Sequence, residues 1–160
     1  MSFLEQDLEN IIYKADSDEL VNRGLYIEGK FLRQQSIGNY GIADLITYYR
    51  HFDKIVINVI ELKKDSINLD AFYQAVRYVR GIQEYIFNFR DKNPENYVFE
   101  ITLIGRKIDD QSTLVFIPDV INNPYQMNTT CIKFYKYKYE IKGIYFEEIE
   151  GYKLTENGFK

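Results

Sequence analysis

The stretch IELKKDSINLDAFYQAVRY, residues 60–78, contains the residues that decide the fold of this chain. It begins at the end of an apolar run, 54–62, whose length and composition predict a buried β-strand. Glu61 and Lys63 lie two positions apart there, so the pleat of a strand places both side chains on one face. A helical pattern follows over 68–89, with an N-cap at its first residue and an apolar stripe along one side. The stretch therefore predicts a strand, a charged edge and a long helix in succession.

A second strand, predicted over 41–49, precedes this one and fixes where its charges lie. The polar turn between the two strands is centred near Phe52 and Asp53, and this register sets Asp44 directly opposite Glu61. Adjacent carboxylates repel each other unless a positive charge compensates them, and hard oxygen ligands favour Mg²⁺ or Mn²⁺. The spacing therefore predicts a metal site with an ammonium group beside it. The competing interpretation is a solvent-exposed cluster of charges at the end of a sheet.

The rest of the chain reads as helices and strands that build a layered α/β domain in which hairpins dominate the sheet. An amphipathic helix is expected over 2–15 and a short helix over 18–22. Further strands are expected over 25–35, 97–104, 114–117, 131–139 and 143–150.

Composition limits the classes of protein to which the chain can belong. Its 160 residues fit one domain, and 46% hydrophobic residues are typical of a folded chain. The net charge of -4 argues against a protein that coats nucleic acid indiscriminately, although a local basic strip can still hold a phosphate backbone. No apolar segment approaches the roughly 20 residues of a membrane span. The acidic opening segment and the single cysteine, Cys131, predict a cytoplasmic protein without a membrane partner.

Three short motifs resemble, in their order and separation, those of the PD-(D/E)xK nuclease superfamily. They are Gly41-Ile-Ala-Asp44, Ile60-Glu61-Leu-Lys63 and Gln74-Ala-Val-Arg-Tyr78. They look like the RecB-type and NucS-type branches and the archaeal Holliday-junction resolvases, except that Ala43 replaces the family's proline. The resemblance implies an α/β fold with a restriction-endonuclease-like core, in which a mixed, mostly antiparallel sheet is flanked by helices. It implies a single domain over 1–160, with the core at 4–105 and a C-terminal strand extension at 106–160.

The resemblance also implies a set of metal ligands. Asp44 and Glu61 would bind Mg²⁺ or Mn²⁺, with the carbonyl oxygen of Leu62 as a further ligand. A glutamate of the opening helix would complete the metal shell. Glu5 and Glu9 both fit that position, and Glu9 is slightly favoured.

Other side chains would serve catalysis beside these ligands. Lys63 would position the attacking water or help to deprotonate it, and Gln74 would reach the site from the long helix. Asp44, Glu61, Lys63 and Gln74 form the expected catalytic set. Gln35 would brace the site from the neighbouring strand, the alternative being an ordinary polar residue of an edge strand.

Contacts with nucleic acid are expected beside the centre, from Lys64, Arg77, Tyr78 and Arg80. The alternative is that these basic side chains are solvated along the helix. The segment 133–139 alternates lysines with tyrosines and could stack bases, although tyrosines packed inward are the favoured interpretation.

The function implied by the resemblance is hydrolysis of DNA phosphodiester bonds by metal-activated water. An endonuclease is favoured over an exonuclease, because the sequence marks no end-binding module. A homodimer is also expected, because one site cuts one strand. The sequence does not distinguish DNA from RNA as the substrate. The alternative function is a non-catalytic nucleic-acid- or protein-binding module that retains the nuclease fold.

Overall fold

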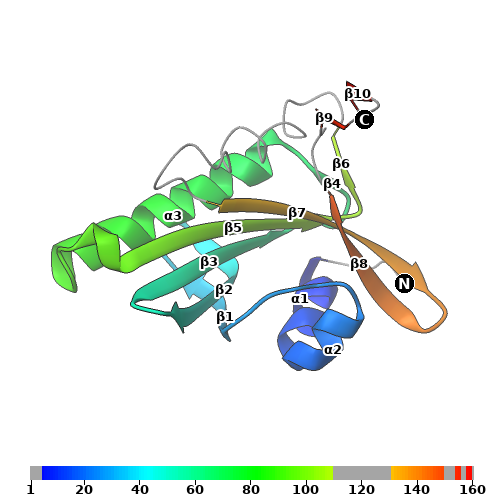
Figure 1. Ribbon diagram of the computed structural model, residues 1–160, viewed down its shortest axis with the longest axis horizontal. Coiled ribbons are helices and arrows are strands. Elements are labelled where there is room, and N and C mark those ends of the chain that lie inside the picture. The colour runs from blue at the N-terminus through cyan, green and yellow to red at the C-terminus, as the bar shows by residue number, and fades with distance from the viewer. Residues whose placement is uncertain (1–4, 110–130, 150–153, 156–157, 160) are drawn as a thin grey trace.

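A six-stranded sheet forms the centre of the computed structural model, which describes residues 5–109, 131–149, 154–155 and 158–159 (Figure 1). The strand order is β1-β2-β3-β5-β7-β8. The pairs β1–β2, β2–β3 and β7–β8 are antiparallel, and the pairs β3–β5 and β5–β7 are parallel. The sheet is therefore mixed and mostly antiparallel, as the sequence predicted. Its strands are β1 Lys30–Ser36, β2 Ile42–His51, β3 Lys54–Leu62, β5 Tyr97–Gly105, β7 Cys131–Glu140 and β8 Gly143–Ile149.

Helices cover both faces of this sheet. The helix α3, Leu69–Phe89, lies along one face, and the helices α1, Glu5–Lys14, and α2, Ser17–Asn22, pack on the other (Figure 1). Two short 3-10 helices, η1 Gly38–Tyr40 and η2 Pro94–Asn96, connect elements of the sheet and α3. None of the helices in the described part of the chain has the length and apolar character of a membrane span.

Strand β3 is apolar on both faces because it lies in the interior of the sheet. Val59 belongs to the core beneath α3, whereas Ile60 and Leu62 belong to the core beneath α1. Because side chains alternate along a strand, Glu61 shares the α3 side with Val59. The Glu61 carboxylate therefore lies in the layer between the sheet and α3, at the end of an otherwise apolar strand.

Helix α3 begins and ends where the sequence predicted. The side chain of Asn68 caps it by accepting a hydrogen bond from the Ala71 N–H at 3.0 Å. A buried stripe of small and branched residues then faces the sheet, namely Ala71, Ala75, Val79 and Ile86. The helix is therefore anchored along its length, and its first turns lie over the end of β3 that carries Glu61.

The first predicted strand is shorter than expected. Leu25 and Ile27 are buried beneath α1 and α2, but pairing with β2 starts only at Lys30. Gly29 precedes that residue with φ 103°, and a Cβ there would lie 2.6 Å from the carbonyl oxygen of Tyr48. This turn separates the segment 25–28 from the ladder, although its alternating pattern resembles that of a strand.

Several short elements had no counterpart in the prediction. Strand β4, Ser66–Ile67, pairs in parallel with β6, Lys107–Ile108. Strand β9, Leu154–Thr155, pairs with β10, Gly158–Phe159. The strand expected over 114–117 lies outside the described residues.

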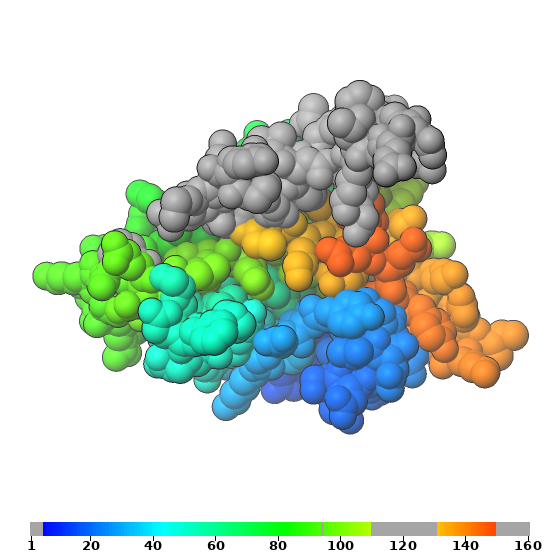
Figure 2. Space-filling view, viewed as in Figure 1, coloured from blue at the N-terminus to red at the C-terminus, as the bar shows by residue number. Residues whose placement is uncertain are grey.

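Strands β7 and β8 continue the same sheet instead of forming a separate layer. Tyr135 and Tyr137 of β7 are buried on the α1 side, so the inward-packing interpretation of 133–139 is confirmed for these two residues. Strand β8 borders the segment of α2, as the orange and blue surfaces of Figure 2 show, and the Phe146 N–H donates to the Arg23 carbonyl at 2.7 Å. Strand β8, at the edge of the sheet, is therefore held against the end of α2.

Candidate active site

Strands β2 and β3 pair in the register predicted from their turn. His51 lies opposite Lys54, and Leu45 lies opposite Ile60 as the last pair of the ladder. Asp44 is the next residue beyond that pair, and its Oδ2 accepts a hydrogen bond from the Leu62 N–H at 3.0 Å. This contact holds the Asp44 carboxylate at the end of β3, where Glu61 also lies.

Glu61 is a nearly buried carboxylate with an incomplete set of partners. Its side chain is 5% exposed, and Oε2 has no hydrogen-bond partner among the described residues. Lys63 forms an ion pair with Glu61, with its Nζ 3.5 Å from Oε1. Burial, and after it the nearby charge of Asp44, raise the pKa of Glu61 to about 8 against the opposing effect of Lys63. The geometry thus brings Asp44, Glu61 and Lys63 together as the sequence predicted.

The Asp44 carboxylate is half-buried and surrounded by other acids. Burial raises the pKa of Asp44 most, the Leu62 N–H lowers it, and the charges of Glu9 and Glu5 raise it again. Both glutamates of α1 therefore lie close enough to Asp44 to act on it electrostatically. A cavity of about 330 Å³ opens at this point, lined by Glu5, Gln6, Glu9, Gln34 and Asp44.

The two candidate glutamates of α1 differ in their surroundings. Glu9 is 3% exposed, and its two oxygens accept hydrogen bonds from Arg33 Nη2 at 2.8 Å and from Gln34 Nε2 at 2.5 Å. Glu5 is exposed, and its Oε1 accepts from the Lys64 N–H at 3.2 Å. Glu9 is therefore held by side chains of β1, whereas Glu5 remains accessible beside the end of β3. Which of the two completes a metal shell stays a prediction.

The glutamine that meets this cluster is Gln34 and not Gln35. Gln34 lines the acidic cavity, whereas Gln35 lines a different cavity on the α3 side of β1. The bracing role expected of Gln35 from the resemblance is therefore not supported by its position, and the neighbouring Gln34, with φ 49°, reaches the cluster. No local signal in the sequence marks that conformation.

Gln74 and Tyr78 of α3 form a chain of hydrogen bonds to β2. Gln74 Nε2 donates to the Tyr78 hydroxyl at 2.6 Å, and that hydroxyl donates to the Ile42 carbonyl at 2.8 Å. The Tyr78 ring packs at Gly41, where a Cβ would lie 3.3 Å from its Cε1 and where φ is 114°. Tyr78 is only 1% exposed, so the structure gives it a supporting contact, whereas the sequence led us to expect a contact with nucleic acid.

Comparison with known proteins places this geometry in a recognised fold. No protein-family model matches the chain, and no curated protein matches it. Among solved structures it is similar to the crystal structure of a repair endonuclease from Pyrococcus abyssi, with a TM-score of 0.51 and 20% sequence identity. The similarity covers 85% of this chain and 47% of that chain. This chain shares the fold of a repair endonuclease.

The restriction-endonuclease-like fold expected from the three motifs is thereby confirmed at the level of the fold. The structure of an EndoMS-dsDNA2 complex is also similar, with a TM-score of 0.48, 19% identity, and coverage of 85% of this chain and 46% of that chain. The chain thus spans about half the length of each of these two proteins.

The candidate site offers two carboxylates to a metal ion, Asp44 and Glu61. Across residues 5–109 and 131–149, no group of three or more His, Cys, Asp or Glu side chains is arranged to hold a metal. Asp44 and Glu61 nevertheless form a close pair of carboxylates, and Glu61 Oε2 is buried without a partner. A divalent cation would satisfy that oxygen and compensate the repulsion within the pair. The two carboxylates fit such an ion, and a ligand role for the Leu62 carbonyl stays a prediction.

The basic residues expected to contact nucleic acid come from two elements, the end of β3 and the helix α3. Lys64 directly follows Lys63 and is half-buried, and its carbonyl accepts a hydrogen bond from the Tyr137 hydroxyl. Arg77 and Arg80 are exposed on α3, where Arg80 Nε lies 3.3 Å from Glu84 Oε1. Their contacts with nucleic acid remain predictions.

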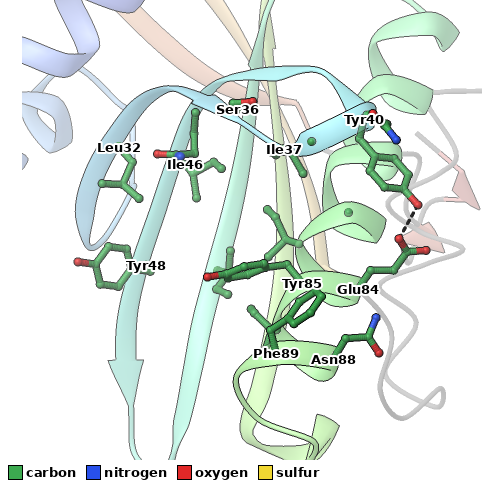
Figure 3. Close-up of a pocket in the computed structure, with 17 residues that line it drawn as sticks. Leu32, Ser36, Ile37, Tyr40, Ile46, Tyr48, Glu84, Tyr85, Asn88 and Phe89 are labelled. Carbon is green, nitrogen blue, oxygen red and sulfur yellow. Dashed lines mark hydrogen bonds between the residues drawn. The ribbon is translucent and has the colours of Figure 1, made fainter.

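A larger cavity of about 700 Å³ lies between the second half of α3 and the strands β1 and β2. Figure 3 shows Tyr85 and Phe89 of α3 facing Tyr48 of β2 across it, with the Tyr40 hydroxyl donating to Glu84 at 2.8 Å at its rim. Its lining is mostly apolar and includes none of the candidate metal ligands. The candidate metal ligands therefore lie apart from this cavity, near the half of α3 that carries Gln74.

Proposed function

We propose that this protein is a metal-dependent nuclease that hydrolyses phosphodiester bonds in DNA. One observation carries the proposal: Asp44 and Glu61 converge beside Lys63, and one oxygen of the buried Glu61 carboxylate has no partner among the described residues. The fold shared with a repair endonuclease supports the same conclusion. Mg²⁺ or Mn²⁺ is the proposed cofactor, because both ions prefer carboxylate ligands.

Each side chain of the site would have a separate role in hydrolysis. When bound, the divalent ion would polarise the scissile phosphate and lower the pKa of a water ligand. Asp44 and Glu61 would hold this ion, and the bond from the Leu62 N–H would keep the Asp44 carboxylate in place. The Lys63 ammonium, 3.5 Å from Glu61, would stabilise negative charge that develops on the phosphate oxygens. Gln74 would present polar atoms toward the site from a helix anchored by Tyr78.

The finer features of the proposal concern the substrate and the assembly. We propose DNA as the substrate because the similar solved structure is a repair endonuclease. Lys64, Arg77 and Arg80 would track the phosphate backbone on either side of the scissile bond. A homodimer would supply one site for each strand of a duplex.

The first experiment measures cleavage of labelled duplex, single-stranded and branched DNA, and of RNA, with Mg²⁺, Mn²⁺ or EDTA. Wild type is compared with Glu61→Gln and Lys63→Met. Glutamine keeps the shape of the glutamate but removes its charge, and methionine keeps the stem of the lysine but removes its ammonium. We expect cleavage that requires metal, and a loss of about 100-fold or more in rate for each variant.

Glu100→Gln is the matched control for these substitutions. Glu100 is a partly buried carboxylate whose pKa is also raised by burial, but it pairs with Asn58 and Cys131, lies on the opposite face of the sheet from Glu61 and lines a different cavity. The Glu100→Gln variant should cleave the substrate at the rate of wild type. A folded wild-type protein that is inert on every substrate with either metal would contradict the nuclease and favour the binding module.

A further inference from the structure

The backbone of β1 departs from regular strand geometry at one residue beside the candidate site. Arg33 pairs with Leu45 and Gln35 pairs with Ala43, but the ladder contains no pair between Gln34 and Asp44. Gln34 has φ 49°, in the left-handed region that non-glycine residues rarely occupy. Such a conformation costs free energy and persists only where surrounding contacts enforce it, often at a functional site.

This conformation brings the Gln34 side chain onto the helix α1. Its Nε2 donates to Glu9 Oε1 at 2.5 Å. The neighbouring Arg33 donates through Nη2 to Glu9 Oε2 at 2.8 Å and to Asn10 Oδ1 at 2.5 Å. Its guanidinium also lies 5.0 Å from the centre of the Tyr13 ring. Two consecutive residues of β1 thus hold both oxygens of a buried carboxylate, which a regular strand would not allow because successive side chains alternate between faces.

The absence of a pair between Gln34 and Asp44 also concerns the contacts that Asp44 makes. Asp44 is the residue that would face Gln34, and its carboxylate instead accepts from the Leu62 N–H of β3. Gln34, Glu9 and Asp44 then line one cavity of about 330 Å³. The distortion of β1 is therefore located where a strand, a helix and a candidate metal ligand meet.

We propose that Gln34 is a positioning residue whose left-handed backbone conformation holds the Glu9 carboxylate beside Asp44 and thereby fixes the acidic side of the metal site. The inference rests on the proposed function, because it assigns Gln34 a role toward the proposed metal. Gln34 acts through Glu9 and does not itself contact the ion. Partners of this kind, which orient the groups around a metal, change metal affinity when they are removed.

The test measures Mn²⁺ binding to the 160-residue chain by isothermal titration calorimetry, and thermal unfolding in EDTA. Gln34→Gly removes the amide and relieves the backbone conformation, so we expect a dissociation constant at least about 10-fold higher with no fall in the unfolding temperature. Gln34→Asn keeps an amide and a residue type that tolerates positive φ, but its shorter side chain does not reach Glu9. It should bind Mn²⁺ as weakly as Gln34→Gly.

Gln35→Gly is the matched control, since Gln35 is the same residue type one position along and lines the other cavity. Glycine there weakens an ordinary strand position, so we expect a lower unfolding temperature with an unchanged dissociation constant for Mn²⁺. Gln34→Gly should show the opposite, namely a higher dissociation constant for Mn²⁺ with no fall in the unfolding temperature.

A double-mutant cycle separates a positioning role from a structural one. If Gln34 acts through Glu9, Gln34→Gly should have no additional effect on Mn²⁺ binding in a Glu9→Gln background. Wild-type affinity in Gln34→Gly, or an equal loss with and without Glu9→Gln, would overturn the inference while leaving the nuclease intact. A wild-type protein that binds no Mn²⁺ would overturn the metal-dependent function, and this inference with it.

Discussion

At the scale of single residues, Glu61 determines the pH behaviour expected of the metal-free protein. Burial and the charge of Asp44 raise the pKa of Glu61 from 4.5 to about 8, and burial also raises the pKa of Asp44. Between pH 4.5 and about pH 8, Glu61 therefore keeps its proton in the folded state but has released it in the unfolded state. The free energy of unfolding should therefore fall as the pH rises from 4.5 to about 8, by at most about 1.4 kcal/mol per pH unit from this group.

Urea unfolding of wild type and Glu61→Gln in EDTA, from about pH 5 to about pH 8, checks this expectation. Glutamine does not titrate, so its substitution should flatten most of the slope and make the protein more stable than wild type at the upper end. Equal slopes for the two proteins would show that Glu61 is ionised in the folded state over this range.

Single residues also show where sequence reasoning succeeds and where it fails. The meeting of Asp44 with the end of β3 was predictable, because a polar turn fixes the register of the hairpin locally. The contact of Gln34 with Glu9 was not, because it joins β1 to a helix distant in the sequence and involves a residue with φ 49°. Tyr78 was expected to contact nucleic acid but is buried, because helical spacing alone does not tell a buried phenol from an exposed one.

At the scale of elements, the contact between α3 and the start of β2 supports the site. Tyr78→Phe keeps the buried ring but removes the hydroxyl that donates to Ile42 and accepts from Gln74. We expect a loss of about 1 kcal/mol in the free energy of unfolding, because the Ile42 carbonyl loses its donor. Cleavage should also slow, since Gln74 loses the contact that orients its amide.

The control for this change is Tyr40→Phe. It removes a hydroxyl that donates to Glu84 at 2.8 Å in an exposed position on η1, and water can replace that bond. Urea unfolding and cleavage assays on both variants check the prediction. A Tyr78→Phe protein that matches Tyr40→Phe in stability and rate would contradict a supporting role for the hydroxyl.

Elements with a strong local pattern were predicted best. The bounds of β3 and α3 agree with the sequence, because a long apolar run and a capped helical stripe are both local signals. Strands β4 and β6 were missed because two residues are too few to show a period. The late start of β1 follows from Gly29, whose close approach to Tyr48 comes from the tertiary structure.

At the scale of the whole molecule, local sequence patterns did not predict the order of the strands in the sheet. The hairpins β2–β3 and β7–β8 follow from nearby turns, but the placement of β5 between β3 and β7 in two parallel pairs joins segments far apart in the chain. The sequence suggested a core over 4–105 and a strand extension over 106–160. In the structure β7 is an interior strand of the single large sheet, so the described part of that extension contributes to the core.

A chain truncated after residue 109 tests how far the core depends on β7 and β8. The truncation exposes the edge of β5 and removes Phe134, Tyr135 and Tyr137, which are buried on the two faces of the sheet. We expect the truncated chain to lack a cooperative thermal transition by circular dichroism, because the cores beneath α1 and α3 both lose apolar contacts. The full chain with Ile141→Ser is the control, since Ile141 is fully exposed in the turn between β7 and β8 and should be replaceable. If the truncated chain instead unfolds cooperatively near the wild-type midpoint, residues 4–105 form a self-sufficient core and β7 and β8 are accessory to it.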